Sequence, residues 1–280
     1  MGKLNWLYRQ LNLLSLDVVA GVVICAVFFS EIFEVHIRPQ GLVTLALTVW
    51  IIYTTDHLLD AHRIQGTAST ERHRFHQQNF LLLFIFLAIG TIINVILIFF
   101  IREAVFLWGL WLIGFVVFYL LFQKWLRFFK ELIAALLYSG GVMLPSLAGS
   151  TLAIDFFIGA LIVQFFLTAW FNLMLFSWFD EEKDIQDKHH SFVTTVGHTG
   201  TKRFLFFIFL CQLALFIGQL IHRTPWSVPL YILMMMNSIL LLILLCRTWF
   251  AVHDRFRLLG DAVFLFPVLF ILENTWHEWI

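Results

Sequence analysis

The sequence predicts an all-α integral membrane protein, a bundle of about nine transmembrane helices. Of its 280 residues, 61% are hydrophobic and only 13% are charged, whereas an average soluble domain carries about 25% charged residues. The chain also contains 33 Phe and 11 Trp, more aromatic surface than a soluble protein could bury. This composition excludes a disordered chain, a nucleic-acid binder and a secreted disulfide scaffold.

Nine windows are long and apolar enough to cross a bilayer, which takes about 20 mainly apolar residues. Unpaired backbone groups are costly in lipid, and the runs are too long and unbroken for barrel strands, so each window predicts a helix. Met1 to Trp6 shows no cleavable signal pattern, so we expect the first window to remain as an anchor. We expect one membrane domain over 1–280, with spans at 14–33, 42–61, 80–101, 104–122, 132–150, 156–178, 204–222, 227–246 and 258–273.

Lysines and arginines are distributed unevenly between the two sets of loops. With the N-terminus in the cytoplasm, fifteen of them fall on the cytoplasmic side and only Arg38, Arg102 and Arg223 fall on the other side. The positive-inside rule therefore predicts a cytoplasmic N-terminus. An odd number of spans then puts the C-terminus outside, and we expect the protein in the cell (inner) membrane.

The second and sixth spans each end in a pair of aspartates, at the start of the long loops 62–79 and 180–203. Asp56 and Asp60 are four residues apart, and Asp180 and Asp184 repeat this spacing. On a continuing helix such residues share one face, where two carboxylates repel each other and the helix dipole disfavours both. We expect a cation to compensate them, and Mg²⁺ suits ligation by oxygens alone. The alternative is that these aspartates are ordinary water-exposed acids next to the membrane. This alternative would explain a single pair well, but it explains two matched pairs less well.

These segments resemble the paired Asp-rich motifs of the UbiA superfamily of intramembrane aromatic prenyltransferases, which have nine transmembrane helices. Asp180 and Asp184 match the family's second motif, DxxxD, and Ser191 and Gly197 follow at the family's distances. A third segment is similar to the family's Tyr…Lys stretch before helix 5, and its matching residues are Tyr119, Lys124, Glu131, Gly140, Gly141 and Pro145.

The first motif departs from the family pattern, which reads NDxxDxxxD. Asp56 stands where the family has Asn, His57 stands where it has Asp, and only Asp60 matches directly. The third Asp position is Ile64, and the usual Gly after the second motif is Lys188. Because imidazole is a softer ligand than carboxylate, His57 would shift the site away from magnesium. These departures touch the catalytic motif rather than the fold.

The resemblance implies Mg²⁺-dependent transfer of an isoprenyl group from its diphosphate to an aromatic or other lipophilic acceptor. A leaving diphosphate needs its charge neutralised, and an allylic carbocation needs a dry, aromatic site. The implied metal ligands are Asp56, His57, Asp60, Asp180 and Asp184, of which Asp60, Asp180 and Asp184 are the catalytic set. Lys124 is the implied contact to phosphate, because it matches the family's Lys. Arg63, Lys183, Lys188 and Asn172 are further candidates, and for the three basic residues among them a role in setting membrane topology is the alternative.

Other polar residues of the spans have two interpretations. Asn172 and Gln164, deep in span 6, either line a cavity or form hydrogen bonds between helices. Asp17 and Asp261 either deprotonate an acceptor or pair with His253 or Arg257, and we expect pairing.

Two further functions stay open. The first is a membrane di-iron desaturase or hydroxylase, because clustered imidazoles suit iron; its His boxes would be His57…His62, His73…His76 and His189-His190. That family usually has about four spans, and membership in it would leave the two Asp pairs unexplained. The second is a catalytically degenerate UbiA-like protein that binds lipid or a partner. An enzyme should lose turnover when Asp56 or Asp60 becomes Ala, whereas a scaffold should tolerate both changes.

Overall fold

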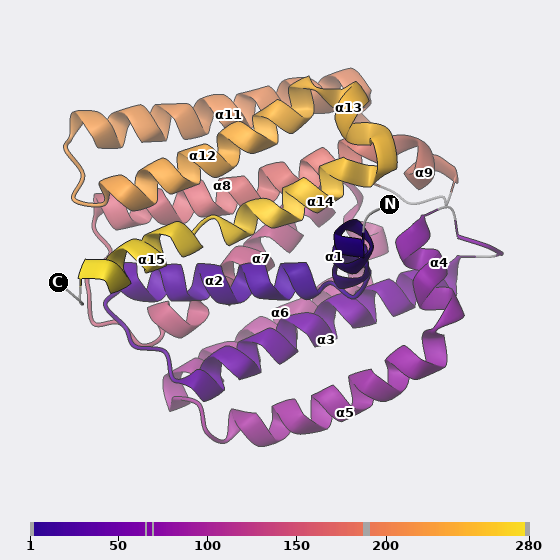
Figure 1. Ribbon diagram of the computed structural model, residues 1–280, viewed down its shortest axis with the longest axis horizontal. Coiled ribbons are helices and arrows are strands. Elements are labelled where there is room, and N and C mark those ends of the chain that lie inside the picture. Colours follow the sequence, from indigo (N-terminus) through magenta and orange to yellow (C-terminus); the bar gives the residue numbers. More distant parts are fainter. Residues whose placement is uncertain (1–2, 65, 69, 187–190, 278–280) are drawn as a thin grey trace.

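The computed structural model describes residues 3–64, 66–68, 70–186 and 191–277, and over these residues its regular structure is entirely helical. Long helices run side by side along the longest axis of the molecule (Figure 1). The predicted fold class, a helical bundle, is confirmed. The elements are α1 (Lys3–Leu13), α2 (Leu16–Ile32), α3 (Pro39–Arg63), α4 (Glu71–Gln78), α5 (Phe80–Ile98), α6 (Glu103–Leu126), η1 (Arg127–Phe129), α7 (Lys130–Leu147), α8 (Phe156–Phe179), α9 (Glu181–Gln186), α10 (Phe192–Val196), α11 (His198–Ile221), α12 (Ser227–Leu245), α13 (Arg247–Ala251), η2 (Val252–Asp254), α14 (Arg255–Ala262), η3 (Val263–Leu265) and α15 (Val268–His277).

Six of the described helices, α3, α5, α6, α8, α11 and α12, are long and apolar enough to cross a membrane. The other three predicted windows fall on shorter or interrupted helices. α2 has 17 residues, and α7 begins with Lys130 and Glu131. The last window is divided among α14, η3 and α15, with Pro267 at the final break, where its missing N–H interrupts the helical ladder. The chain is an integral membrane protein, and the count of nine spans stays a prediction.

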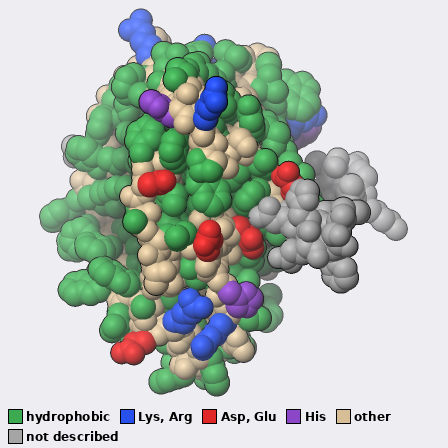
Figure 2. Space-filling model, turned by 90° about the vertical axis from the view of Figure 1, so that its left-hand side faces the viewer, with side chains coloured by type: hydrophobic (Ala, Val, Ile, Leu, Met, Phe, Trp, Pro, Cys, Tyr) green, Lys and Arg blue, Asp and Glu red, His purple; other side chains and the backbone are tan. Residues whose placement is uncertain are grey.

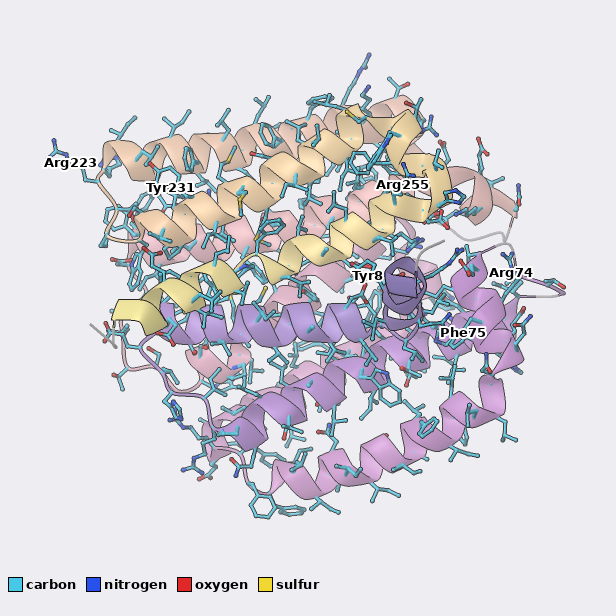
Figure 3. All side chains as sticks on the ribbon, viewed as in Figure 1. Tyr8, Arg74, Phe75, Arg223, Tyr231 and Arg255 are labelled. Atoms are coloured by element: carbon cyan, nitrogen blue, oxygen red, sulfur yellow. The ribbon has the colours of Figure 1, made fainter. Side chains whose placement is uncertain are left out.

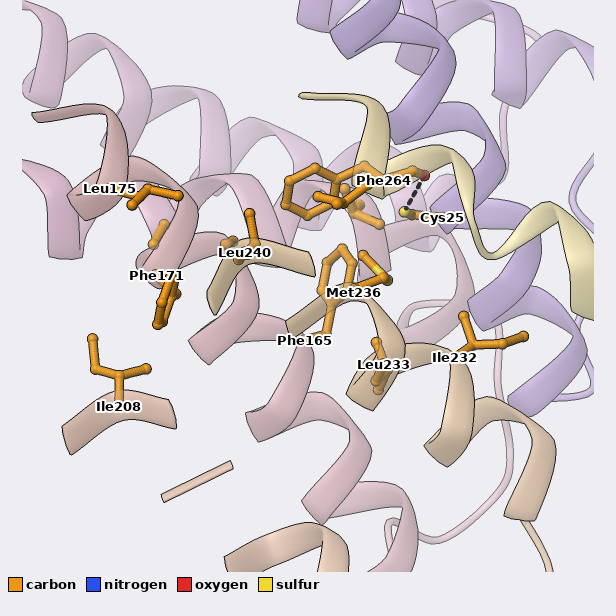
Figure 4. Packing of buried hydrophobic residues seen from close by; sticks show 14 of the residues in the cluster. Cys25, Phe165, Phe171, Leu175, Ile208, Ile232, Leu233, Met236, Leu240 and Phe264 are labelled. Carbon is orange, nitrogen blue, oxygen red and sulfur yellow. Dashed lines mark hydrogen bonds between the residues drawn. The ribbon is translucent and has the colours of Figure 1, made fainter. Parts of the chain in front are cut away.

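α8 is the central helix, because it packs against α7, α11 and α12 and most of its length is buried. Its Phe165 lies edge-on to Phe29 of α2, with ring centroids 5.0 Å apart, and to Phe264 of η3 at 6.1 Å. Phe165, Phe171 and Leu175 are buried in one cluster with side chains of α11 and α12 (Figure 4). Lipid is as apolar as these side chains, so close packing rather than burial from water stabilises the contacts.

The outer helices present apolar side chains to their surroundings. On α6, Trp111 and Trp125 are largely exposed, as are Leu81 of α5 and Phe99 at its C-terminal end. Exposed apolar surface of this extent matches a lipid environment. The end of the bundle at the left of Figure 1 carries isolated charged side chains among hydrophobic ones (Figure 2).

Short helices gather at the opposite end of the bundle, where α3 and α8 end. α1, α4, α9 and α13 all lie there, at the right of Figure 1. Tyr8 of α1 donates a hydrogen bond to the Leu258 carbonyl of α14 at 2.7 Å (Figure 3). The Gln77 amide of α4 donates to the carbonyls of Ala61 and Gly66, both at 3.1 Å. These bonds hold α1 against α14, and α4 against the segment that follows the first Asp pair.

Candidate active site

A cavity of about 260 Å³ lies at this end, between α3, α7, α8 and the short helices. Its wall contains six carboxylates and three cationic side chains among the described residues. The acids are Asp56, Asp60, Glu131, Asp180, Asp184 and Asp261, and the cations are Arg72, Lys130 and Arg257. Both predicted Asp pairs therefore face one space, although they come from helices more than 100 residues apart in the sequence.

The first pair lies on an unbroken helix, as its spacing predicts. α3 continues to Arg63, so Asp56 and Asp60 both line the cavity. Asp56 accepts a hydrogen bond from the Gln123 amide of α6 at 3.2 Å. Asp60 pairs with Arg63, with Oδ1 and Nη1 3.5 Å apart. Arg63 does not line the cavity, so in this structure it neutralises Asp60 instead of facing a ligand.

The second pair does not lie on one continuous helix, contrary to the geometry expected from its spacing. α8 ends at Phe179, Asp180 is its C-cap, and Asp184 lies in the separate helix α9. The Asp184 N–H still donates to the Asp180 carbonyl at 2.8 Å, so the chain turns helically across the break. Both carboxylates line the cavity.

Asp180 is already neutralised by two cations. It is only 4% exposed, and it forms an ion pair with the Arg257 guanidinium. Lys183 Nζ lies 3.1 Å from its other oxygen and 3.0 Å from Asp254. Burial opposes the ammonium charge, but Asp180 and Asp254 together outweigh it and raise the pKa of Lys183. Lys183 therefore stays charged as a partner of the carboxylates and does not line the cavity.

Three histidines meet beside the first pair. His57 is 8% exposed and lines the cavity, and its Nε2 has no hydrogen-bond partner among the described residues. Its ring centroid lies 5.1 Å from that of His76 and 6.4 Å from that of His73. Burial lowers the pKa of His76, so this ring is neutral at pH 7. Over the described part of the chain, no three His, Cys, Asp or Glu side chains are grouped to hold a metal ion.

The remaining predicted phosphate contacts have mixed outcomes. Asn172 lines the cavity, and its Oδ1 has no hydrogen-bond partner among the described residues. The Lys124 side chain and Lys188 lie outside the described residues. Gln164 does not line the cavity; it accepts a hydrogen bond from Gln219 of α11 at 3.1 Å, so it joins helices instead.

Sequence reasoning missed the two arginines of the cavity wall. Arg72 Nη2 lies 3.0 Å from Asn12 Oδ1 and 3.8 Å from Asp261. Asn12 also donates to Asp17 at 2.6 Å and to Asp261 at 3.1 Å. The expectation that Asp17 and Asp261 are paired is correct, but the partners are Asn12 and Arg72 rather than His253 or Arg257. In the sequence, an arginine that follows a span and faces a cavity cannot be distinguished from one that only sets the orientation of the span in the membrane.

The Ser191…Gly197 segment has a local structural role. Ser191 is the N-cap of α10, and its N–H donates to Thr194 Oγ1 at 2.9 Å. Gly197 ends α10 with φ of 83°, a conformation that favours glycine. The Phe192 N–H donates to Glu131 Oε1 at 3.1 Å. The segment therefore fixes Glu131 at the cavity wall.

A second cavity of about 280 Å³ adjoins the first and is almost entirely apolar. It follows α3 from Asp56 to Gly41, a length of about 22 Å at 1.5 Å per residue. The residues that line both cavities are Tyr53, Asp56, Tyr119, Ala134, Tyr138 and Leu173. The site thus combines a charged compartment, a ring of tyrosines at the junction, and a long apolar compartment.

Comparison with solved structures decides the fold. A UbiA homolog from Aeropyrum pernix K1, in its apo form, matches with a TM-score of 0.67 and covers 92% of this chain and 98% of its own, at 12% sequence identity. The chain has the UbiA fold. A UbiA homolog from Archaeoglobus fulgidus bound to DMAPP and Mg²⁺ matches with a TM-score of 0.61 at 13% identity, over 92% of this chain and 97% of its own. The same homolog bound to GPP and Mg²⁺ gives the same TM-score and identity.

The chain matches no protein-family model and no curated protein. The UbiA fold was predicted from the Asp-rich motifs, and that prediction is confirmed. A membrane desaturase was the rival prediction from the histidines. The UbiA fold explains the meeting of the α3 and α8 ends, which a His-box site leaves without a reason.

Proposed function

We propose that this chain is a UbiA-type prenyltransferase, which moves an isoprenyl group from its diphosphate to an aromatic or other lipophilic acceptor. One observation carries the proposal: the charged cavity with both Asp pairs adjoins the long apolar cavity at Asp56. An isoprenyl diphosphate has the matching form, a charged head joined to an apolar tail. The homolog from Archaeoglobus fulgidus was bound to DMAPP and to GPP, each with Mg²⁺.

The donor set of the cavity fits magnesium. Mg²⁺ is usually bound through one or two carboxylates, and phosphate oxygens and water complete its shell. Asp56, Asp60, Asp180 and Asp184 would supply the carboxylates. No described group of acids is preassembled as a metal site, which fits a metal that binds together with the diphosphate. When bound, the ion would neutralise charge on the leaving diphosphate.

The residues at the junction serve the apolar part of the reaction. When the allylic C–O bond breaks, its electron pair leaves with the diphosphate and a carbocation remains at the first carbon of the chain. Tyr53, Tyr119 and Tyr138 line the wall at that position, and aromatic faces attract cations. The apolar walls beyond them keep water from the carbocation. The acceptor then forms the new bond, and its proton goes to a carboxylate of the wall that does not hold the metal ion.

The decisive experiment is release of inorganic diphosphate by the full chain, purified in detergent and given geranylgeranyl diphosphate, Mg²⁺ and a panel of lipophilic phenols. We expect acceptor-dependent release that Asp60→Ala lowers by about 10²-fold or more, a size typical of a lost charge-stabilising group. Arg223→Ala, in the loop at the opposite end, should match the unmodified chain. Binding of the substrate without release would support the degenerate, lipid-binding alternative, and absence of binding would refute both.

We also propose that the charged cavity faces the cytoplasm of the cell and that the protein lies in its inner membrane. The support is the fifteen-to-three distribution of Lys and Arg between the loops. Cysteine labelling of loop positions in intact cells would test this orientation. Labelling of a residue near Arg223 by an impermeant reagent is the expected result, and labelling near Arg74 by that reagent would contradict it.

A further inference from the structure

Asp180 of the second pair is held by more cations than the aspartates of the first pair for which ion pairs are resolved. Asp180 binds the Arg257 guanidinium through one oxygen and Lys183 through the other. A magnesium ion would have to displace these cations before it could bind this carboxylate. On the first pair, Asp56 accepts a neutral amide hydrogen bond from Gln123, and Asp60 has a looser ion pair with Arg63 at 3.5 Å. The two pairs are therefore not equivalent as metal ligands.

Arg257 is held in a fixed position at the cavity wall. Its guanidinium carbon lies 5.3 Å from the ring centroid of Phe176 and 5.5 Å from that of Phe256. The Arg257 side chain is 25% exposed, against 5% for Asp180. A guanidinium has five N–H donors, more than one carboxylate accepts. Donors therefore remain for a second anion in the cavity.

Arg72 brings a second guanidinium to the same wall. Asn12 and Asp261 hold it from one side, at 3.0 and 3.8 Å. Burial lowers the pKa of Arg72, and the positive charge of Arg257 lowers it further. Two half-buried cations that repel each other are stabilised by an anion that binds both. Planar guanidinium groups match phosphate oxygens in bidentate geometry.

We propose that Arg257 takes the place of a metal ion at Asp180, so that Arg257 and Arg72 bind the diphosphate directly and Mg²⁺ depends on the Asp56–Asp60 pair. The inference rests on the proposed function and narrows it. Asp180, one of the four carboxylates assigned to Mg²⁺ above, is then a positioning residue for Arg257 rather than a metal ligand. The negative charge of the departing diphosphate is then neutralised from two sides of the cavity: by the Mg²⁺ held at Asp56 and Asp60, and by the guanidinium groups of Arg257 and Arg72.

The test uses calorimetry to measure how the full chain in detergent binds inorganic diphosphate at increasing concentrations of Mg²⁺. Asp60→Asn should raise the Mg²⁺ concentration at half-saturation by about tenfold or more, since even outer-shell changes cost 10–100-fold in metal affinity. Asp180→Asn should leave this midpoint where the unmodified chain has it. If Asp180→Asn only destabilises the fold, its unfolding temperature should fall, but its Mg²⁺ concentration at half-saturation should still lie below that of Asp60→Asn.

The arginine variants test the other half of the proposal at saturating Mg²⁺. Arg257→Gln and Arg72→Gln should each weaken diphosphate binding by about tenfold or more, the effect of losing a charged hydrogen bond. Arg257→Lys keeps the charge beside Asp180 without the bidentate fork, so it should fold and still bind more weakly. Arg255→Gln is the matched control, because Arg255 stacks on Trp249 at 4.5 Å, outside the cavity wall.

The outcomes separate this inference from the function on which it rests. An increase of the midpoint in Asp180→Asn as large as in Asp60→Asn would identify Asp180 as a metal ligand and overturn the inference alone. Unchanged binding in both the Lys and Gln variants of Arg257 would overturn it as well. If the unmodified chain binds no diphosphate at any Mg²⁺ concentration, the proposed function fails too.

Discussion

At the scale of single residues, Glu131 shows how burial sets a charge state at the cavity. It is 5% exposed at the start of α7, with Oε1 bonded to the Phe192 N–H. Burial raises the pKa of Glu131, and the bond to Phe192 only partly opposes this. The folded chain therefore holds the proton at pH values where the unfolded chain has lost it. The stability that this proton supplies is complete below the unfolded pKa, about 4.3 for Glu, and is lost as pH rises through the folded pKa.

Glu131→Gln should remove this pH dependence, because the amide mimics the protonated carboxyl and can still accept from Phe192. We expect equal unfolding temperatures near pH 4 and a growing advantage of the Gln variant as pH rises toward 8. Tryptophan fluorescence during thermal unfolding in one detergent measures both proteins. A difference that stays constant over this range would mean that folding does not raise the pKa of Glu131.

The aspartates of the site could be predicted from spacing, whereas the arginines could not. Asp56, Asp60, Asp180 and Asp184 stand out because acids are unfavourable at a helix C-terminus. Arg72 and Arg257 are two of fifteen basic residues assigned to one side of the membrane. Which of them faces the cavity depends on contacts with Asn12 and Asp180, residues 60 and 77 positions away.

At the scale of elements, hydropathy predicted the helices but not their ends or their faces. The spacing of Asp180 and Asp184 indicated one helix, yet the chain breaks between α8 and α9. Asn172 and Gln164 are eight residues apart on α8, but only Asn172 lines the cavity. The side of α8 that faces α11 and the side that faces the cavity are equally apolar, so one sequence cannot distinguish them.

α6 supplies a wall of the apolar cavity that a single substitution can fill. Gly109 lies on that wall, and a Cβ there would meet no other atom within 4 Å. It is about 15 Å along α6 from Tyr119, at 1.5 Å per residue. Gly109→Phe should therefore block long isoprenyl chains and spare short ones. We expect kcat/KM for geranylgeranyl diphosphate to fall about tenfold or more relative to dimethylallyl diphosphate, the effect of a few lost methylene contacts.

Gly114→Phe is the matched control for this change. Gly114 is also on α6 with open space at its Cβ, but it does not line the cavity. Diphosphate release measured with both substrates gives the ratio for each variant. Equal effects of the two substitutions, or no change of the ratio in Gly109→Phe, would show that the isoprenyl tail does not occupy this cavity.

At the scale of the whole molecule, a buried ionic network joins the beginning of the chain to its last third. Asn12 of α1 bridges Asp17 of α2, Asp261 of α14 and Arg72 of α4. All three bonds lie at the end of the bundle that holds the charged cavity. Sequence analysis could anticipate that the two aspartates are paired, but not that an asparagine near the N-terminus separates their charges.

Asn12→Leu should therefore destabilise the bundle more than an ordinary polar deletion in a membrane helix. It removes two donors and leaves the carboxylates of Asp17 and Asp261 facing each other without a neutral bridge. Leaving a buried group without its hydrogen bond costs about 1–3 kcal/mol, and more when the group is charged. Asn94→Leu is the control, because Asn94 makes a single neutral bond to Thr48 at 2.8 Å, worth about 0.6 kcal/mol in a membrane protein. Denaturant unfolding in one detergent compares the two losses, and equal losses would show that the network does not hold the chain's two ends together.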